Sequence, residues 1–107
     1  MAVINTEAVI RQMAERLVEQ FRPEKIILFG SMARDEPTED SDVDLLVVVQ
    51  EFEDRRALRI AMRRALNGMG LPKDVVVLTT EEFETKRRIP GTIAYPADKE
   101  GRVLYAA

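Results

Sequence analysis

The sequence predicts an α/β (α+β) fold in a single domain over residues 1–107, with a mixed sheet of three to four strands and helices packed on it. Two patterns predict this class. Apolar residues recur at helical spacing in some segments, and short runs rich in valine, isoleucine and leucine lie between those segments. Such alternation is typical of one α/β sandwich, and 107 residues is the size of one ordinary domain.

The first helix is expected over the first twenty-odd residues, where apolar side chains recur three or four positions apart: Ile10, Met13, Ala14, Leu17, Val18 and Phe21. Asn5 or Thr6 can cap its start, and Arg22-Pro23 ends it because a residue before proline avoids helical angles. Lys25–Phe29 is then predicted to be a short buried strand that stops at Gly30.

The middle of the chain predicts two further strands around a second helix. A short helical turn over Met32–Asp35 and a loop over residues 36–41 lead into a strand over Asp42–Val49. A helix is expected over Asp54–Asn67, and a strand that is almost all valine follows over Asp74–Leu78.

The C-terminal third predicts two short helices and a small strand. Thr79-Thr80-Glu81-Glu82 has the pattern of a capping box, which opens a helix that ends near Lys86. A helical turn over Thr92–Lys99 and a strand over Arg102–Tyr105 complete the expected fold.

The composition excludes several kinds of chemistry. Cysteine and histidine are both absent, which excludes disulfides, Cys/His zinc sites, thiol nucleophiles and imidazole acid–base catalysis. A metal ion would need oxygen ligands, which favours Mg²⁺, Mn²⁺ or Ca²⁺. The net charge of −3 does not suit bulk binding of a polyanion. No apolar run approaches the ~18 residues of a membrane helix, so a cytoplasmic protein without membrane contact is expected.

Two carboxylates open the second expected strand. Asp42 and Asp44 are two residues apart, so in a strand they project from the same face, about 6.5 Å apart along the chain. Side by side they repel each other and lose hydration, which a divalent cation compensates. Two cations about 4 Å apart need a third carboxylate, and Asp74 opens the next strand with the same pattern. The alternative, a solvated turn residue, is stronger for Asp74 alone than for the pair.

Gly30 and Ser31 directly follow the first buried strand. Glycine lets the backbone approach a ligand closely, the next turn directs N–H groups outward, and Ser31 adds a hydroxyl. Arg34, one helical turn further on, can reach the same phosphate oxygens. The alternative is an ordinary tight turn, and neither a Walker loop nor a Gly-x-Gly-x-x-Gly fingerprint is present.

Residues 28–47 combine Leu-Phe-Gly-Ser-Met-Ala-Arg, a short polar loop and Ser-Asp-Val-Asp-Leu-Leu-Val, and together closely resemble the signature of the polymerase-β-like nucleotidyltransferase superfamily. The small size and the tail Ile-Pro-Gly-Thr-Ile-Ala-Tyr…Glu-Gly-Arg-Val-Leu-Tyr are similar to the minimal nucleotidyltransferases, the antitoxins of bacterial and archaeal pairs with HEPN-domain toxins. The resemblance implies a single-domain nucleotidyltransferase palm. One departure is visible, because Asp35 stands where many relatives have glycine.

The resemblance also implies roles for the matched residues. Four are expected to bind the nucleotide: Gly30, Ser31, Arg34 and Ser41. Three acids are expected to be catalytic and to hold one or two Mg²⁺ ions: Asp42, Asp44 and Asp74. The implied reaction transfers a nucleoside monophosphate from an NTP, AMP in the case of ATP. The acceptor is a hydroxyl of a HEPN partner, such as that of a tyrosine. The transfer blocks the RNase activity of this partner.

Other functions stay open. A non-catalytic antitoxin that acts by occlusion suits the small size and Asp35, whereas a transferase of the antibiotic-modifying kind would need an extra helical domain for its acceptor. The arginines of the second helix can contact nucleic acid or an acidic partner, or they can form a solvated face that pairs with acids of the preceding loop: Glu51, Glu53 and Asp54. An aromatic content of 6% argues against a stacking platform, so direct nucleic-acid binding is not expected.

Overall fold

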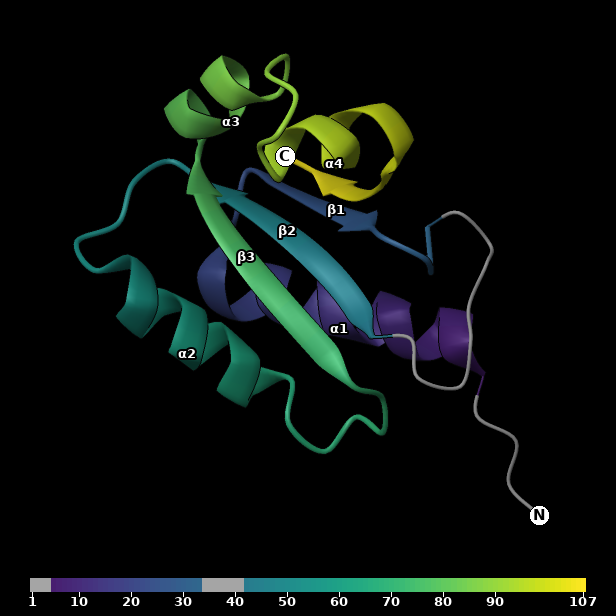
Figure 1. Cartoon of the computed structure of the whole chain (residues 1–107). Coiled ribbons are helices and arrows are strands. Elements are labelled where there is room, and N and C mark those ends of the chain that lie inside the picture. The colour runs from purple at the N-terminus through teal and green to yellow at the C-terminus, as the bar shows by residue number, and fades with distance from the viewer. Residues whose placement is uncertain (1–4, 34–41) are drawn as a thin grey trace.

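The computed structural model describes residues 5–33 and 42–107 (Figure 1). Its elements follow one another in the order α1 (Thr6–Phe21), β1 (Lys25–Phe29), β2 (Val43–Val49), α2 (Arg55–Ala65), β3 (Lys73–Thr79), α3 (Thr80–Lys86), α4 (Ala94–Glu100) and β4 (Arg102–Ala106). The helices and strands expected within these residues are therefore present. Part of the helical turn expected over Met32–Asp35 and all of the loop expected over residues 36–41 lie outside the described residues.

The four strands form one mixed sheet in the order β3-β2-β1-β4. β2 and β3 run parallel, while β1 is antiparallel to both β2 and β4. The two central strands are buried on both faces, and for that reason their sequences are continuous apolar runs rather than alternating ones. The α/β prediction with a mixed sheet is confirmed.

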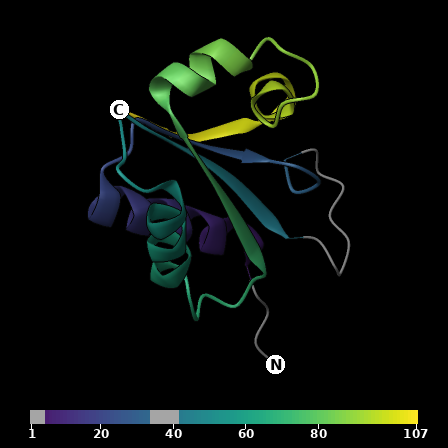
Figure 2. The ribbon, with the colours of Figure 1, turned by 60° about the vertical axis from the view of Figure 1, so that its left-hand side comes forward.

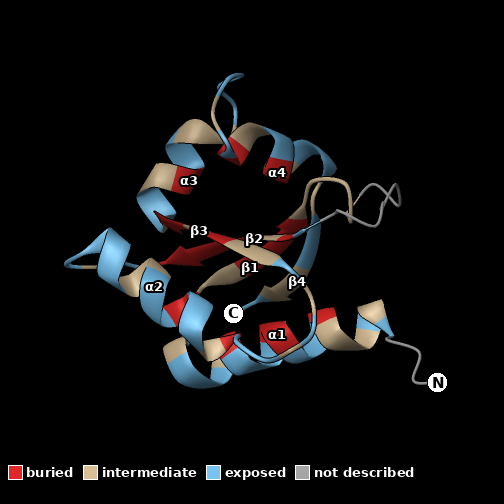
Figure 3. Ribbon diagram, turned by 60° about the horizontal axis from the view of Figure 1, so that its bottom comes forward, coloured by how far each residue is buried: buried red, intermediate tan, exposed pale blue. Residues whose placement is uncertain are grey.

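Helices cover both faces of the sheet, α1 and α2 on one side and α3 and α4 on the other (Figures 2 and 3). Successive side chains of β2 point to opposite faces. Leu45 and Val47 join the apolar cluster beneath α1 and α2, whereas Leu46 and Val48 join the cluster beneath α3 and α4. Asp44 has the same parity as Leu46, so it projects on the α3/α4 side of the sheet.

Side-chain caps define where the helices start. Asn5 accepts a hydrogen bond from the N–H of Ala8 at 3.2 Å, which confirms it as the cap of α1. At α3, Thr79 and Glu82 form the predicted capping box. Within residues 5–33 and 42–107, no helix is both long enough and apolar enough to cross a bilayer.

Several boundaries differ slightly from the expectation. β2 begins at Val43, so Asp42 lies just before the strand, and β3 begins one residue earlier than predicted, at Lys73. α2 ends at Ala65 rather than at Asn67, because Leu66 leaves the helical conformation at φ −96° and ψ 3°. These shifts leave the order and pairing of the elements unchanged.

Candidate active site

The predicted site residues gather at one end of the sheet. Because β1 runs against β2 and β2 runs with β3, the C-terminal end of β1 meets the N-terminal ends of β2 and β3 (Figure 1). This end carries five of the residues singled out in the sequence: Gly30, Ser31, Asp42, Asp44 and Asp74. Arg34 and Ser41, also expected at the site, lie outside the described residues.

Asp44 and Asp74 are direct neighbours in the parallel pairing of β2 and β3. Adjacent strands lie about 4.8 Å apart, so the two residues are closer across the sheet than Asp42 and Asp44 are along the chain. Asp44 and Asp74 are paired in register and therefore project from the same face, while Asp42 lies one residue before β2. The adjacency of the two acid-bearing strands, expected from the sequence, is what brings Asp74 to Asp44.

Gly30 lies against the carboxylate of Asp44. Its φ is +77°, a left-handed conformation that side chains rarely adopt. A Cβ added to Gly30 would overlap Oδ2 of Asp44 and lie 3.3 Å from its Cγ. Two independent constraints therefore require glycine here, one from the backbone angle and one from the neighbouring acid.

Electrostatics join the three acids into one cluster. The pKa of Asp44 is raised above its ordinary value, first by partial burial and then by the negative charges of Asp42 and Asp74. The ionised form of Asp44 therefore destabilises the folded protein relative to the protonated form. Binding a proton or a cation at this end of the sheet relieves this destabilisation.

An arginine that the sequence analysis did not assign to the site holds the third acid. Nη2 of Arg59, on α2, lies 3.1 Å from Oδ1 of Asp74, and Nε donates to the carbonyl oxygen of Val75 at 2.9 Å. Both charged side chains are partly exposed, at 42% and 45%. No spacing in the sequence could show this contact, because it depends on how α2 lies across the edge strand β3.

The expected pairing of the α2 arginines with the loop before the helix is wrong. Arg55 pairs with Glu82, and Arg59 pairs with Asp74. Asp54 instead caps α2, where its side chain accepts the N–H of Ala57 at 3.1 Å. A capping carboxylate faces the helix end, which turns it away from the outward arginines.

The acids fit a divalent cation only in part. Asp42 and Asp44 offer carboxylate oxygens from one face of one strand end, the donor type that Mg²⁺ prefers. The three acids do not form a ready three-ligand group, however, as no such group occurs among the residues that the structure describes. Asp74 has its Oδ1 engaged by Arg59. The pair is therefore the core of the candidate metal site, while Asp74 keeps only Oδ2 free of the ion pair with Arg59.

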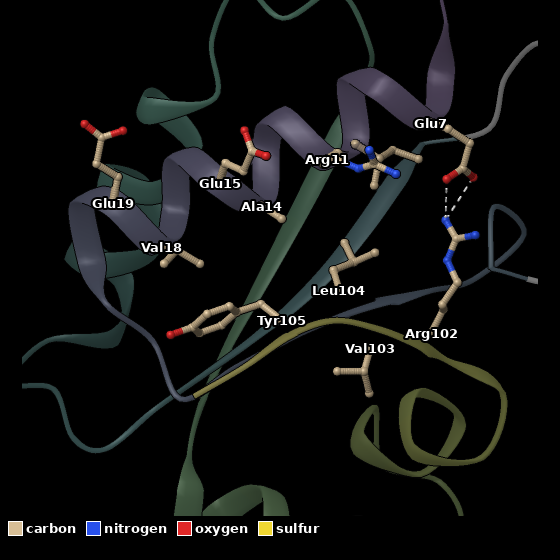
Figure 4. Close-up of a pocket in the computed structure, with 11 residues that line it drawn as sticks. Glu7, Arg11, Ala14, Glu15, Val18, Glu19, Arg102, Val103, Leu104 and Tyr105 are labelled. Atoms are coloured by element: carbon tan, nitrogen blue, oxygen red, sulfur yellow. Dashed lines mark hydrogen bonds and ion pairs between the residues drawn. The ribbon is translucent and has the colours of Figure 1, made fainter.

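A separate groove of about 580 Å³ lies between α1 and β4 (Figure 4). Arg102 and Glu7 close one end of it with an ion pair of 2.9 Å, and Tyr105 lies toward the other end. None of the three acids lines this groove. β4 is the sheet edge opposite to β3, so the groove and the acid cluster are distinct features.

The mixed sheet carries acids at the adjoining ends of β2 and β3, beside the glycine turn that follows β1. This arrangement is suited to binding phosphorylated nucleotides. Residues 10–96 match the family described as "Nucleotidyltransferase domain". The chain belongs to this family and is a nucleotidyltransferase, so the resemblance seen in residues 28–47 is confirmed.

Relatives from Methanocaldococcus jannaschii extend this similarity. One, named "Putative protein adenylyltransferase MJ0604", is 33% identical over 104 residues, which is 95% of this chain and 100% of the relative. A second, named "Putative protein adenylyltransferase MJ0128", is 41% identical over 46 residues, 43% of this chain and 47% of the relative.

Solved structures share the fold. A nucleotidyltransferase structure from Sulfolobus solfataricus aligns with a TM-score of 0.63 and 22% identity over 92% of this chain and 78% of that one. A mutant of the toxin–antitoxin MntA-HpeT aligns with a TM-score of 0.58 and 19% identity over 98% of this chain and 75% of that one. At these identities the likeness concerns the fold.

Proposed function

We propose that this chain transfers AMP from ATP to a hydroxyl of a partner protein and thereby acts as the antitoxin of a HEPN-type RNase toxin. The name of the full-length archaeal relative supports protein adenylylation, and the shared fold with MntA-HpeT supports the toxin–antitoxin setting. The observation that carries the proposal is the pairing of Asp44 with Asp74 beside Gly30, at the end of the sheet where β1 ends.

The end of β1 binds the nucleotide in this proposal. Gly30 presents its backbone and Ser31 its hydroxyl to the β- and γ-phosphates, and Arg34 and Ser41 add further contacts. Asp42 and Asp44 hold Mg²⁺, which when bound neutralises the triphosphate and polarises the α-phosphorus.

The transfer step uses Asp74 as the base. The acceptor oxygen forms a bond to the α-phosphorus while the bond from that phosphorus to the bridging oxygen of the β-phosphate breaks, and its electron pair leaves with pyrophosphate. The hydroxyl proton passes to Oδ2 of Asp74. Arg59 holds the other oxygen, Oδ1, so the base stays oriented while Oδ2 receives the proton.

Incubation with ATP labelled at its α-phosphate, Mg²⁺ and a purified HEPN-type protein tests the proposal. We expect label on the partner, and a loss of at least about a hundredfold in Asp42→Asn and Asp44→Asn, the scale of removing a charged group from a phosphoryl-transfer site. Glu51→Gln is the matched control, because Glu51 is an exposed acid beyond the opposite end of β2. Labelling that persists in both aspartate variants removes the catalytic role.

A non-catalytic antitoxin is the second candidate, and the ion pair of Arg59 with Asp74 favours it, since the positive charge beside this acid opposes the binding of a second cation. Cells that express the toxin discriminate the two functions. The double variant Asp42→Asn/Asp44→Asn protects them if occlusion is sufficient and fails to protect them if transfer is required. Equal amounts of soluble antitoxin in both strains are the control.

A further inference from the structure

The outer face of α2 carries positive charge that nothing in the described structure neutralises. α2 holds five arginines in eleven residues and no acid. Two of them are matched, Arg55 by Glu82 and Arg59 by Asp74. The other three are exposed, and their side chains make no hydrogen bond or ion pair with another residue of the described part of the chain: Arg56, Arg63 and Arg64.

The stability of α2 by itself explains only part of this charge. Arg59 and Arg63 are one turn apart, and like charges at that spacing repel each other. Arg56 lies in the first turn, where the helix dipole disfavours a cation. Only Arg63 and Arg64, in the last turn, gain from the dipole. The helix dipole therefore favours Arg63 and Arg64 but not Arg56, whereas a partner of opposite charge would match all three.

An exposed aliphatic side chain lies at the centre of this cluster. Ile60 is 39% exposed, on the side of α2 opposite the buried Met62. Arg56 precedes it by four residues, and Arg63 and Arg64 follow it by three and four, so all three surround it on the helix surface. An apolar centre with an arginine rim is the composition of protein-binding surfaces. None of these four side chains is aromatic, so this face offers no group on which a base would stack.

The position of this face suits the delivery of an acceptor. Arg59, on the same helix, reaches around the edge strand β3 to Asp74. β3 forms one open edge of the sheet, with α2 alongside it (Figure 2). A protein bound to α2 thus lies next to the strand that carries the third acid.

From these contacts we propose that the α2 patch (Arg56, Ile60, Arg63 and Arg64) docks an acidic surface of the protein that carries the acceptor hydroxyl. This inference rests on the proposed function, in which that acceptor is the HEPN-type protein. Carboxylates of the partner pair with the three arginines, and an apolar side chain of the partner covers Ile60.

Binding of the purified HEPN-type protein to this chain, measured by calorimetry, tests the docking surface. We expect Arg56→Glu/Arg63→Glu to weaken binding at least tenfold, and Ile60→Ser to weaken it severalfold. Arg11→Glu/Arg88→Glu makes the same change in net charge at exposed arginines outside α2, and it is expected to bind within twofold of the unaltered chain. Thermal unfolding confirms that each variant is folded.

The same proteins in the labelling assay separate this inference from the proposed function. Docking through α2 predicts that Arg56→Glu/Arg63→Glu raises the KM for the partner while kcat at saturation is kept. Unchanged binding and unchanged KM overturn the docking surface and leave the transfer reaction standing. Binding that is lost on charge reversal, in a chain that transfers no label, overturns the reaction and leaves the surface standing. Loss of affinity for a single-stranded RNA, with partner binding intact, assigns the patch to RNA and overturns the proposal.

Discussion

Nη2 of Arg59 lies 3.1 Å from Oδ1 of Asp74, so a cation from α2 offsets part of the negative charge of the third acid. The arginine also donates to the edge carbonyl of Val75, which fixes it beside the acid. The third acid of the site is therefore held by the protein itself, and the charge of Arg59 competes with that of any metal ion at Asp74.

Arg59→Ala is expected to tighten the binding of Mn²⁺, because it removes a competing charge from Asp74. The gain is about twofold to fivefold in Kd, the equivalent of the roughly 0.2–1 kcal/mol of an exposed ion pair. Titration calorimetry measures it. Arg56→Ala, which removes the same charge from the same helix without touching Asp74, is the control. Weaker binding in Arg59→Ala would show that the arginine orients Asp74 for the metal instead.

Gly30→Ala is expected to destabilise the fold and to abolish transfer. The left-handed angle alone costs a non-glycine residue about 1 kcal/mol, and the clash with Asp44 adds to this. Gly68→Ala isolates the second effect, since Gly68 has a φ of +80° and nothing within 4 Å of an added Cβ. Urea unfolding should show a larger loss for Gly30→Ala, and only this variant should lose labelling. Equal losses would mean that the acid moves aside freely.

Asp44→Asn is expected to stabilise the protein at neutral pH. The folded-state pKa of Asp44 is raised, so its ionisation costs stability as the pH rises through that pKa, and the cost is absent below the unfolded value. The gain over the unaltered chain should be near zero at about pH 3 and should grow as the pH rises to neutral. Urea unfolding across this range measures it.

Two further measurements check that prediction. Added Mg²⁺ should stabilise the unaltered chain but not Asp44→Asn, because a cation bound at the acids compensates the same charge. Glu51→Gln, at an exposed position away from the cluster, should show no comparable pH-dependent gain. A difference between Asp44→Asn and the unaltered chain that is constant from pH 3 to neutral would contradict the electrostatic origin.

Thr79→Ala is expected to lower stability without affecting the chemistry. The change removes the capping box of α3 and costs about 1 kcal/mol, or about 4–8 °C in Tm. Because Thr79 ends β3, at the opposite end from Asp74, transfer per folded molecule should be kept. Thr85→Ala, within α3 and exposed, is the control. A loss of transfer at a temperature where the variant is folded would contradict this separation.

Most of the site could be predicted because it depends on strand geometry. The two-residue period places Asp42 and Asp44 on one face, and a neighbouring strand with the same pattern supplies Asp74. The positive φ of Gly30 also agrees with its place directly after a buried run. Local patterns suffice for these features, since each follows from a few consecutive residues.

Features that depend on how elements pack could not be predicted. Arg59 and Asp74 are fifteen residues apart, and they meet only because α2 lies along β3.

Arg22 ends α1 in the left-handed conformation, with a φ of 47°, which is unusual for a residue other than glycine. Its N–H still donates to the carbonyl of Val18 at 3.0 Å, and Pro23 prevents the helix from continuing.

The in-register contact of Asp44 with Asp74 has a consequence for folding studies. Sliding β3 by one position along β2 would turn Asp74 to the opposite face of the sheet and bring Val75 beside Asp44. Recovery of labelling during renaturation would then time the moment at which these two strands find their correct alignment, whereas circular dichroism would register secondary structure in either alignment.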